Sequence, residues 1–337
     1  MHPAIRRPRG ALRSALALAL PALVSLAPAA QAQAQSQAQD WPTRPIRMLV
    51  GFGPGGGTDI IARMVAQPLA EQLGQAVVIE NKPGAGGTLA ANTVARAAPD
   101  GHTVFVMNNG HAVSAAMYKQ LPFDAVKDFA PVSTLCAQPL VVAVGKKNTA
   151  KDLKALLAMA KASPGKLNYA SVGVGSTQHF AAELLRQISG ADIQHIPYKG
   201  TPNAVAAVLG GEVDMLVEVA SPLLGHIRSG ELKALAVTSP TRFGGLPDTP
   251  TAVESGVRGF DVTTWYALAF PAGTPQPVVD KMNRALTTVL SSDAVKQQML
   301  SSACLAQAST PQALNQHLVA EINRWDDVRN KAGIAKE

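Results

Sequence analysis

The sequence has little of what metal, redox and nucleic-acid sites usually require. It contains two cysteines, Cys136 and Cys304, among 337 residues, which is too few for a disulfide framework. The seven histidines are scattered and form no His-x-x-x-His pair, so we predict no metal ion. No basic stripe is interleaved with aromatic residues, which argues against nucleic acid as a partner. Whether the two cysteines pair or remain buried thiols is left open.

Acidic residues are also missing before Asp40. Four arginines open the chain, an apolar run follows over residues 15–26, and Ala-x-Ala sequences stand at 30–34. This order is typical of a secretory signal peptide, and we predict that residues 1–34 are one. The apolar run is shorter than the roughly 20 residues that span a bilayer, so we expect no membrane insertion after cleavage. Loss of four arginines lowers the formal charge from +7 to +3, too little to indicate nucleic acid or a membrane surface.

The remainder alternates short β-branched runs with longer helical patterns, which is typical of α/β folds built from parallel units. Its roughly 300 residues are enough for one large or two medium domains. Residues 48–59 and 168–179 both run from strand through a Gly-rich turn to a helix, which suggests two similar lobes. We predict strands at 46–52, 77–80, 103–107, 141–144, 167–171, 194–197, 213–217, 233–238 and 264–270, and helices at 59–73, 88–97, 277–290 and 311–331.

The first Gly-rich turn, residues 51–59, contains a G-x-G-x-x-G pattern between a strand and a helix, the form of a dinucleotide site. Pro54 removes a backbone donor from that cradle, and nicotinamide cofactors are not ordinarily available to an exported chain. We therefore predict no cofactor. The free N–H groups at a helix start would equally hold a carboxylate, and a tight turn capped by Thr58 or Asp59 is the purely structural alternative.

The second Gly-rich turn, residues 169–179, supplies the hydroxyls of Ser171, Ser176 and Thr177 at another helix start. Ser176 with His179 as its base would make a hydrolase. However, the G-x-S-x-G elbow is absent, and the histidine three residues along is badly placed for a triad. We therefore predict no catalytic residue, and His179 alternatively packs under the loop.

Motifs along most of the chain resemble one family. They stand at 45–47 (Pro-Ile-Arg), 58–59, 80–87, 98–101, 121–131, 165–171, 197–200, 235–238 and 271–275. In this order, over about residues 41–334, the chain resembles the substrate-binding proteins of tripartite tricarboxylate transporters, also called the Bordetella uptake gene family.

The resemblance implies an α/β, two-lobed periplasmic-binding-protein fold of the Venus-flytrap type, with the ligand cleft between lobes. Lobe 1 would comprise residues 41–137 plus 263–337, and lobe 2 residues 138–262. The function implied is periplasmic capture of a small carboxylate (a di- or tricarboxylate, an amino acid or an aromatic acid) for a tripartite transporter or a sensor. We expect a monomer. The alternative is an exported enzyme acting on a small carboxylic acid.

In relatives the two Gly-rich loops hold the ligand carboxylate, partly through water. Carried over, together with cleft-wall positions, this predicts ligand contacts from Phe52, Gly53, Gly55, Gly56, Gly57, Thr58, Asp59, Asn108, Ser171, Gly173, Val174, Gly175, Ser176, Thr177, His179, Tyr198, Glu218 and Trp265.

Three of these assignments have alternatives. Relatives often carry Phe-Asp-Asn where Val-Glu-Val stands at 217–219. If Glu218 faces the cleft, its charge would favour a ligand with an amino or hydroxyl donor; a surface position is the alternative. Tyr198 lines a pocket or ends a strand. Trp265, with its neighbour Tyr266, forms a cleft wall or hinge or packs in the core.

Overall fold

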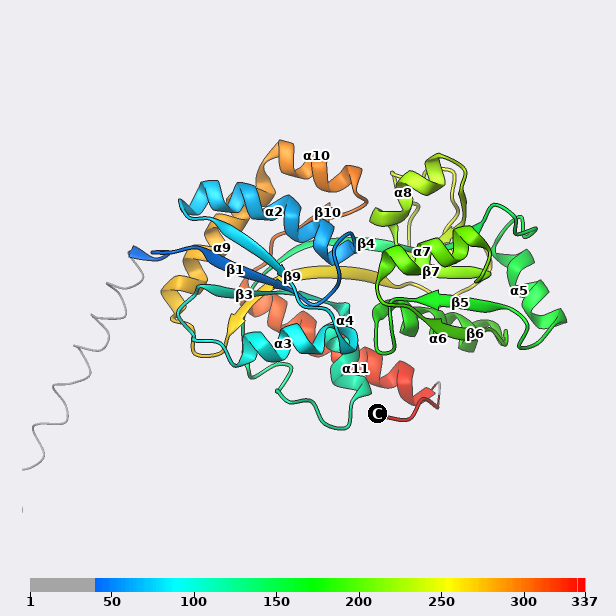
Figure 1. Ribbon diagram of the computed structural model, residues 1–337, viewed down its shortest axis with the longest axis horizontal. Coiled ribbons are helices and arrows are strands. Elements are labelled where there is room, and N and C mark those ends of the chain that lie inside the picture. Colours follow the sequence, from blue (N-terminus) through cyan, green and yellow to red (C-terminus); the bar gives the residue numbers. More distant parts are fainter. Residues whose placement is uncertain (1–39, 332, 337) are drawn as a thin grey trace, which may run out of the picture. The chain divides into compact units, whose positions relative to one another are not determined.

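The computed structural model describes residues 40–331 and 333–336 (Figure 1). From residue 42 onward the chain forms one compact unit, which contains the fold described below. The predicted signal peptide, residues 1–34, lies outside the described residues. Within the described part, no helix is both long and apolar enough to cross a membrane.

One group of strands begins the fold and also contains part of the C-terminal third. Its order is β2-β1-β3-β9-β4, with β1 parallel to β2 and β3, and β9 antiparallel to β3 and β4. The short β10 pairs antiparallel with β4. The strands are β1 Ile46–Val50, β2 Val77–Asn81, β3 Thr103–Asn108, β9 Thr263–Pro271 and β10 Leu305–Ala306, and the helices of this group are α2 Gly57–Leu73, η1 Ala85–Gly87, α3 Thr88–Ala95, α4 Asn109–Met117, α9 Gln276–Ser291, α10 Asp293–Ser301 and α11 Pro311–Lys331.

A second group of strands comes from the middle of the sequence. β7 pairs antiparallel with β4 and parallel with β5, and β6 extends the sheet beyond β5. β8 pairs antiparallel with β4. The strands are β5 Asn168–Ser171, β6 Gln194–Pro197, β7 Met215–Val219 and β8 Leu232–Val237, and the helices are α5 Leu153–Ala162, α6 Thr177–Ser189, α7 Thr201–Gly210 and α8 Ala220–Arg228.

The long strand β4, Phe129–Gly145, belongs to both groups. It pairs with β9 over residues 129–139 and with β7 and β8 from residue 140 onward. In Figure 1 it runs beside β9 from one group of strands into the other. The ends of β1, β3, β5 and β7 that lead into helices therefore meet near the point where β4 changes partners.

The predicted strands and helices are mostly confirmed, with three corrections. The expectation of parallel units holds for β1–β3 and β5–β7 but is wrong for β4 and β9, which run antiparallel to their neighbours. The strand predicted at 141–144 is only the end of β4, and the one predicted at 213–217 lies two residues later, at Met215–Val219. Because of this shift, Glu218 lies within a buried strand instead of following it.

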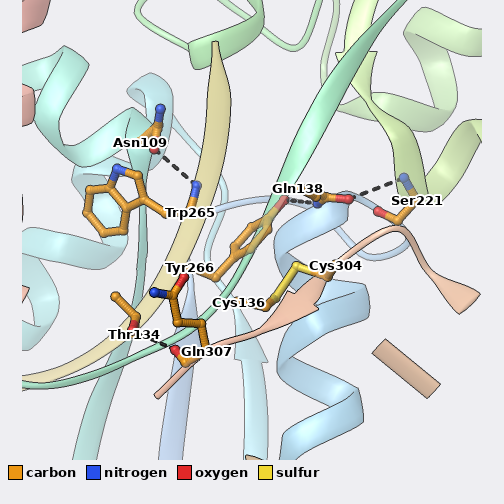
Figure 2. Close-up of a disulfide and its surroundings, with 9 residues drawn as sticks. All are labelled: Asn109, Thr134, Cys136, Gln138, Ser221, Trp265, Tyr266, Cys304 and Gln307. Atoms are coloured by element: carbon orange, nitrogen blue, oxygen red, sulfur yellow. Dashed lines mark hydrogen bonds between the residues drawn. A yellow bond between two sulfur atoms is a disulfide. The ribbon is translucent and has the colours of Figure 1, made fainter. Parts of the chain in front are cut away.

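A disulfide joins Cys136 of β4 to Cys304, just before β10, with 5.6 Å between the Cα atoms (Figure 2). Of the two alternatives left open by the sequence, pairing is the one found. The bond links residues 168 positions apart. A link of this kind limits the freedom of the unfolded chain, and typically adds about 2–4 kcal/mol to the free energy of unfolding.

Candidate ligand-binding site

A small polar cavity lies where the two groups of strands meet. Five helices begin at its wall: α2, α6 and α7 contribute residues of their first turn, and α4 and α8 contribute their N-cap residues. Its volume, about 20 Å³, is enough for roughly one water molecule. The lining residues are Phe52, Gly56, Gly57, Thr58, Asn108, Thr177, Gln178, Thr201, Val219, Thr264 and Tyr266.

The wall of the cavity favours an anion without using a charged side chain. The first N–H groups of a helix have no acceptor within the helix, and the aligned peptide dipoles give that end a partial positive charge. Gly57, Thr58, Thr177, Gln178 and Thr201 all stand at such positions. Among the described residues that line the cavity, none is Lys, Arg or His. A carboxylate would therefore be held here by backbone dipoles and neutral donors.

Two lining residues, Thr58 and Asn108, are joined by a hydrogen bond. The Nδ2 of Asn108 donates to Oγ1 of Thr58 at 2.8 Å, while its Oδ1 accepts from the backbone N–H of Gly110 at 2.9 Å. Because the Thr58 oxygen already accepts, its hydroxyl hydrogen is free to point elsewhere. The Thr58 hydroxyl is therefore arranged as a donor for a ligand in the cavity.

The Tyr266 hydroxyl is oriented in the same way, from strand β9, where Tyr266 is the register partner of Asn108. Nε2 of the buried Gln138 donates to the Tyr266 hydroxyl oxygen, and Oε1 of Gln138 accepts from the N–H of Ser221 at 3.3 Å (Figure 2). Burial raises the pKa of Tyr266, and the nearby charge of Glu218 raises it further, so the hydroxyl stays protonated. Its hydrogen is left to donate into the cavity that the ring lines.

The first Gly-rich loop is held from outside the cavity by Asp59. Its carboxylate accepts from the Gly55 N–H at 2.9 Å, from the Arg63 guanidinium at 2.9 and 3.0 Å, and from Nδ2 of Asn81 at 2.9 Å. Nδ2 of Asn81 also donates to the Phe52 carbonyl. Burial alone would raise the pKa of Asp59, but these hydrogen bonds lower it below its usual value. Asp59 is thus fully occupied in fixing the loop.

The second loop is fixed by its own side chains. Oγ of Ser176 accepts from the N–H of His179 at 3.2 Å and donates to the Gly173 carbonyl at 2.7 Å, so Ser176 is the N-cap of α6. Ser171 lies 2.6 Å from Nε2 of His195, and the His195 ring stacks on His179 at 4.2 Å. Both histidines therefore lie against the loop from behind.

This arrangement bears on the hydrolase alternative. The Ser176 hydroxyl donates to a backbone carbonyl and not to His179, so the predicted nucleophile and base do not form a pair. Ser171 and His195 do touch, but burial lowers the pKa of His195 to about 4, which makes it a weak base near neutral pH. In the described residues, no group of three or more potential ligands is placed to hold a metal ion.

Glu218 lies directly behind the cavity wall and is 1% exposed, which excludes a surface position. Its Oε1 accepts from Nε2 of Gln178 at 2.6 Å and from the Val219 N–H at 2.8 Å. Its Oε2 accepts from the Thr201 hydroxyl at 3.0 Å. Burial raises the pKa of Glu218 to about 7, although the same hydrogen bonds lower it. Glu218 thus orients two residues that line the cavity.

Outside the polar cavity lies a larger cleft of about 490 Å³, to which Phe52 also contributes. One wall comes from the first loop, from residues 83–87 and from Tyr118. The other comes from residues 172–174 and 198–200. The cleft contains Tyr198 and Lys199 but is otherwise built largely from glycine and apolar residues. It offers space for a ligand body bulkier than a carboxylate.

The predicted site residues fall into four groups. Phe52, Gly56, Gly57, Thr58, Asn108 and Thr177 line the polar cavity, and Gly53, Gly173, Val174 and Tyr198 line the outer cleft with Phe52. Gly55, Asp59, Ser171, Gly175, Ser176, His179 and Glu218 lie in the loops or behind the wall. Trp265 is not at the cavity but lines a separate pocket near the disulfide.

The predicted contact residues did not name several polar residues that line or orient the cavity, although Gln178 lay within the second loop, 171–179, and Tyr266 was expected beside Trp265 as a cleft-wall or hinge aromatic. Gln178 and Thr201 stand in the first turns of α6 and α7, and Thr264 and Tyr266 come from β9. For Gln178 and Thr201 the sequence offered a signal, because each is a polar residue in the first turn of a helix that follows a strand. Gln138 had no comparable signal, because its role depends on where β4 crosses between the strand groups.

Comparison with known proteins relates this chain to one protein family. Residues 61–334 match the Tripartite tricarboxylate transporter family receptor. Protein BugT of Bordetella pertussis is 37% identical over 298 residues, which cover 88% of this chain and 91% of BugT.

Two solved structures are similarly close. The periplasmic binding protein BugD is 34% identical, with a TM-score of 0.85 over 88% of this chain and 100% of BugD. MatC from Rhodopseudomonas palustris, solved with bound malate, is 36% identical, with a TM-score of 0.81 over 86% of this chain and 99% of MatC. These neighbours have the predicted two-lobed α/β fold of periplasmic binding proteins.

Proposed function

The chain belongs to the tripartite tricarboxylate transporter receptor family, and on that premise we propose that it is an exported solute-binding protein that captures a small carboxylate. The captured acid would be presented to a tripartite transporter or to a sensor. Residues 1–34 would direct the chain to the periplasm and be removed, and the mature protein would act as a monomer. No covalent step is part of this function.

One observation carries the proposal: five helices begin around a polar cavity that has no basic residue among its described lining. A single carboxylate needs only a few N–H and O–H donors, which Gly57, Thr58, Thr177 and Tyr266 can supply. The carbon skeleton of the acid would then extend past Phe52 into the outer cleft.

We further propose that residues 41–137 with 263–337 form one lobe and residues 138–262 the other. The change of partners along β4, from β9 up to residue 139 to β7 and β8 from residue 140, supports these boundaries. The cavity takes Gly57 and Tyr266 from the first lobe and Gln178 and Thr201 from the second. Because each lobe provides half of the donors, a bound acid would favour the closed arrangement.

A thermal-shift screen of residues 35–337 tests this function. The panel comprises malate, adipate, benzoate and aspartate, with benzamide as the uncharged control for benzoate. A ligand present at 100 times its dissociation constant should add about 2.7 kcal/mol to the free energy of unfolding. We expect at least one acid to raise the melting temperature and benzamide to leave it unchanged.

The same screen can contradict the proposal. If the protein, first freed of any copurified acid by unfolding and refolding, responds to none of the acids, carboxylate capture is wrong. Turnover of an acid during the incubation, detected by mass spectrometry, would favour the enzyme alternative.

A further inference from the structure

Glu218 is a buried acid without a counterion beside a cavity that suits an anion. Its carboxyl group accepts three hydrogen bonds, from Gln178, Val219 and Thr201. In the described part of the chain it forms no ion pair. A buried charge that is hydrogen-bonded but not paired with a cation is costly. Its protonation state therefore depends strongly on any further charge brought nearby.

The charged and titratable groups on the surrounding elements do not neutralise Glu218. Asp59 and Arg63 pair with each other, as do Glu183 and Arg186. Burial lowers the pKa values of His179 and His195, so both rings are neutral near pH 7. The other such groups on these elements are Glu71 in the last turn of α2, Tyr169 of β5, Lys199 before α7, His226 and Arg228 of α8 and Tyr266 of β9, and none of them bonds to the Glu218 carboxyl.

A ligand carboxylate in the cavity would lie close to this acid. The Thr201 hydroxyl lines the cavity and is 3.0 Å from Oε2 of Glu218. A carboxylate oxygen bonded to the same hydroxyl would stand within about 6 Å of Oε2, since such bonds measure about 2.8 Å. Two carboxylates that share a buried site repel, and one of them binds a proton at a raised pKa. The pKa of Glu218, about 7 before any ligand enters, already makes it the easier group to protonate.

The Thr201 hydroxyl also has to change direction. While Glu218 is ionised, both its oxygens only accept, so the Thr201 hydrogen points to Oε2 and away from the cavity. Once Oε2 is protonated, it donates to the Thr201 oxygen, and the Thr201 hydrogen is released towards the cavity. One proton at Glu218 thus removes a repulsive charge and adds a donor for the ligand.

We propose that Glu218 is a positioning and specificity residue that binds one proton from solvent when the acid is captured, and that Thr201 passes this change on as a hydrogen bond to the ligand carboxylate. The inference rests on the proposed function and adds its pH dependence. Affinity should be highest below pH 7 and fall by up to tenfold for each pH unit above it, because protonating Glu218 then has to accompany binding.

Isothermal titration calorimetry of the whole mature chain tests this. Malate, adipate and benzoate serve as probes, and each is titrated at pH 6.5, 7.5 and 8.5 in two buffers with different enthalpies of protonation. Over this range the probes stay ionised, since carboxylic acids titrate near pH 4. The difference in heat between buffers counts the protons taken up. We expect uptake of nearly one proton per acid at pH 8.5 and less at pH 6.5.

Three variants separate a proton switch from a merely structural role. Glu218→Gln gives Thr201 a permanent donor, so binding should become independent of pH, with the wild-type affinity of pH 6.5 retained at pH 8.5. Thr201→Val should lower the affinity at pH 6.5 to about the wild-type value at pH 8.5, whereas Thr201→Ser restores it. Glu321→Gln is the matched control, because Glu321 is also buried but bonds to Asn109 and Trp325, away from the cavity. It should leave the pH dependence intact.

Other results would overturn the inference. If an acid binds without proton uptake, or more tightly as the pH rises, Glu218 stays ionised in the complex and the inference is wrong. Unchanged proton uptake in Glu218→Gln would also contradict it. If no acid binds at any pH, the proposed function itself fails, which distinguishes the two failures.

Discussion

The two Gly-rich loops, residues 51–59 and 169–179, each lead from a strand into a helix, but different contacts hold them in place. In the first, the N-cap of α2 is Gly56, which makes no side-chain cap, and the loop is fixed by Asp59 through Arg63 and Asn81. In the second, Ser176 caps α6 directly. The first loop therefore depends on an ion pair outside the cavity, and the second on a local hydroxyl.

The two loops also differ in how much room they leave for side chains at the start of the helix that follows. A Cβ atom added at Gly57 would lie 2.5 Å from Cγ2 of Val219 and 2.7 Å from Oη of Tyr266. At Gly57 the first loop thus lies so close to Val219 and Tyr266 that no side chain fits. At the second loop, Thr177 and Gln178 occupy the corresponding positions with side chains that line the cavity. At the first two helical positions, the first loop contributes backbone at Gly57 and a side chain at Thr58, whereas the second loop contributes side chains at both.

The largest expected effect comes from Gly57→Ala. Overpacking of about 1–3 kcal/mol, together with displacement of Tyr266, should weaken acid binding by about a hundredfold in calorimetry. Gly53→Ala is the matched control in the same loop, because nothing lies within 4 Å of its added Cβ. Equal losses in both variants would show that close approach at Gly57 is not the cause.

Tyr266→Phe should have the next largest effect. It removes a hydroxyl that faces the cavity, and hydrogen bonds to charged groups contribute about 1.5–3 kcal/mol, or roughly a tenfold to hundredfold loss of affinity. Trp265→Phe, one position earlier on β9 and lining a different pocket, should leave affinity unchanged. A comparable loss in Trp265→Phe would restore Trp265 as a ligand contact.

Asp59→Ala should weaken binding by about 1–3 kcal/mol through loss of the first loop's geometry, and should also lower the melting temperature. The pKa of Asp59 is lowered in the folded state. Its stabilising effect is therefore present above its unfolded pKa of about 4, and is lost as the pH falls below that value. Melting curves from pH 7 to pH 3 should show wild type and variant converging at the acid end; a constant difference would contradict this.

Ser176→Ala should have the smallest effect, about 0.5–2 kcal/mol, which is typical of losing an N-cap. We expect a lower melting temperature and weaker binding, with no change in its pH dependence. Ser176→Thr retains the hydroxyl and should recover most of the loss. If Ser176→Ala cost more binding energy than Asp59→Ala, the second loop would be the more sensitive one.

Local sequence patterns predicted four helices and most strands well. The range predicted for the last helix, 311–331, is that of α11, and 194–197 is that of β6. Strand β4 was largely missed because Pro131 and Pro139 interrupt it, and proline rarely occurs inside strands. Its pairing with β9 and with β8 and β7 on the two sides of residue 139 is a property of the tertiary fold.

The candidate site was predicted only in part, because some of its residues are brought together by the tertiary fold and not by local sequence. A Gly-rich loop after a strand indicates that a helix begins there, so Thr58 and Thr177 could be predicted as ligand contacts from the local sequence. Gln138, Thr201 and Tyr266 come from elements far apart in the chain, and only the fold brings them to one cavity. The burial of Glu218 depended on placing β7 two residues later than the hydrophobic pattern indicated.

The most direct measurement is a crystal structure with the acid that gives the largest thermal shift. We expect one carboxylate in the polar cavity, within hydrogen-bond distance of Thr58, Thr177 or Tyr266, directly or through one water, and the remaining atoms beside Phe52 in the outer cleft. A carboxylate bound instead to Lys199 at the cleft mouth, with the cavity left to water, would contradict capture by helix N-termini.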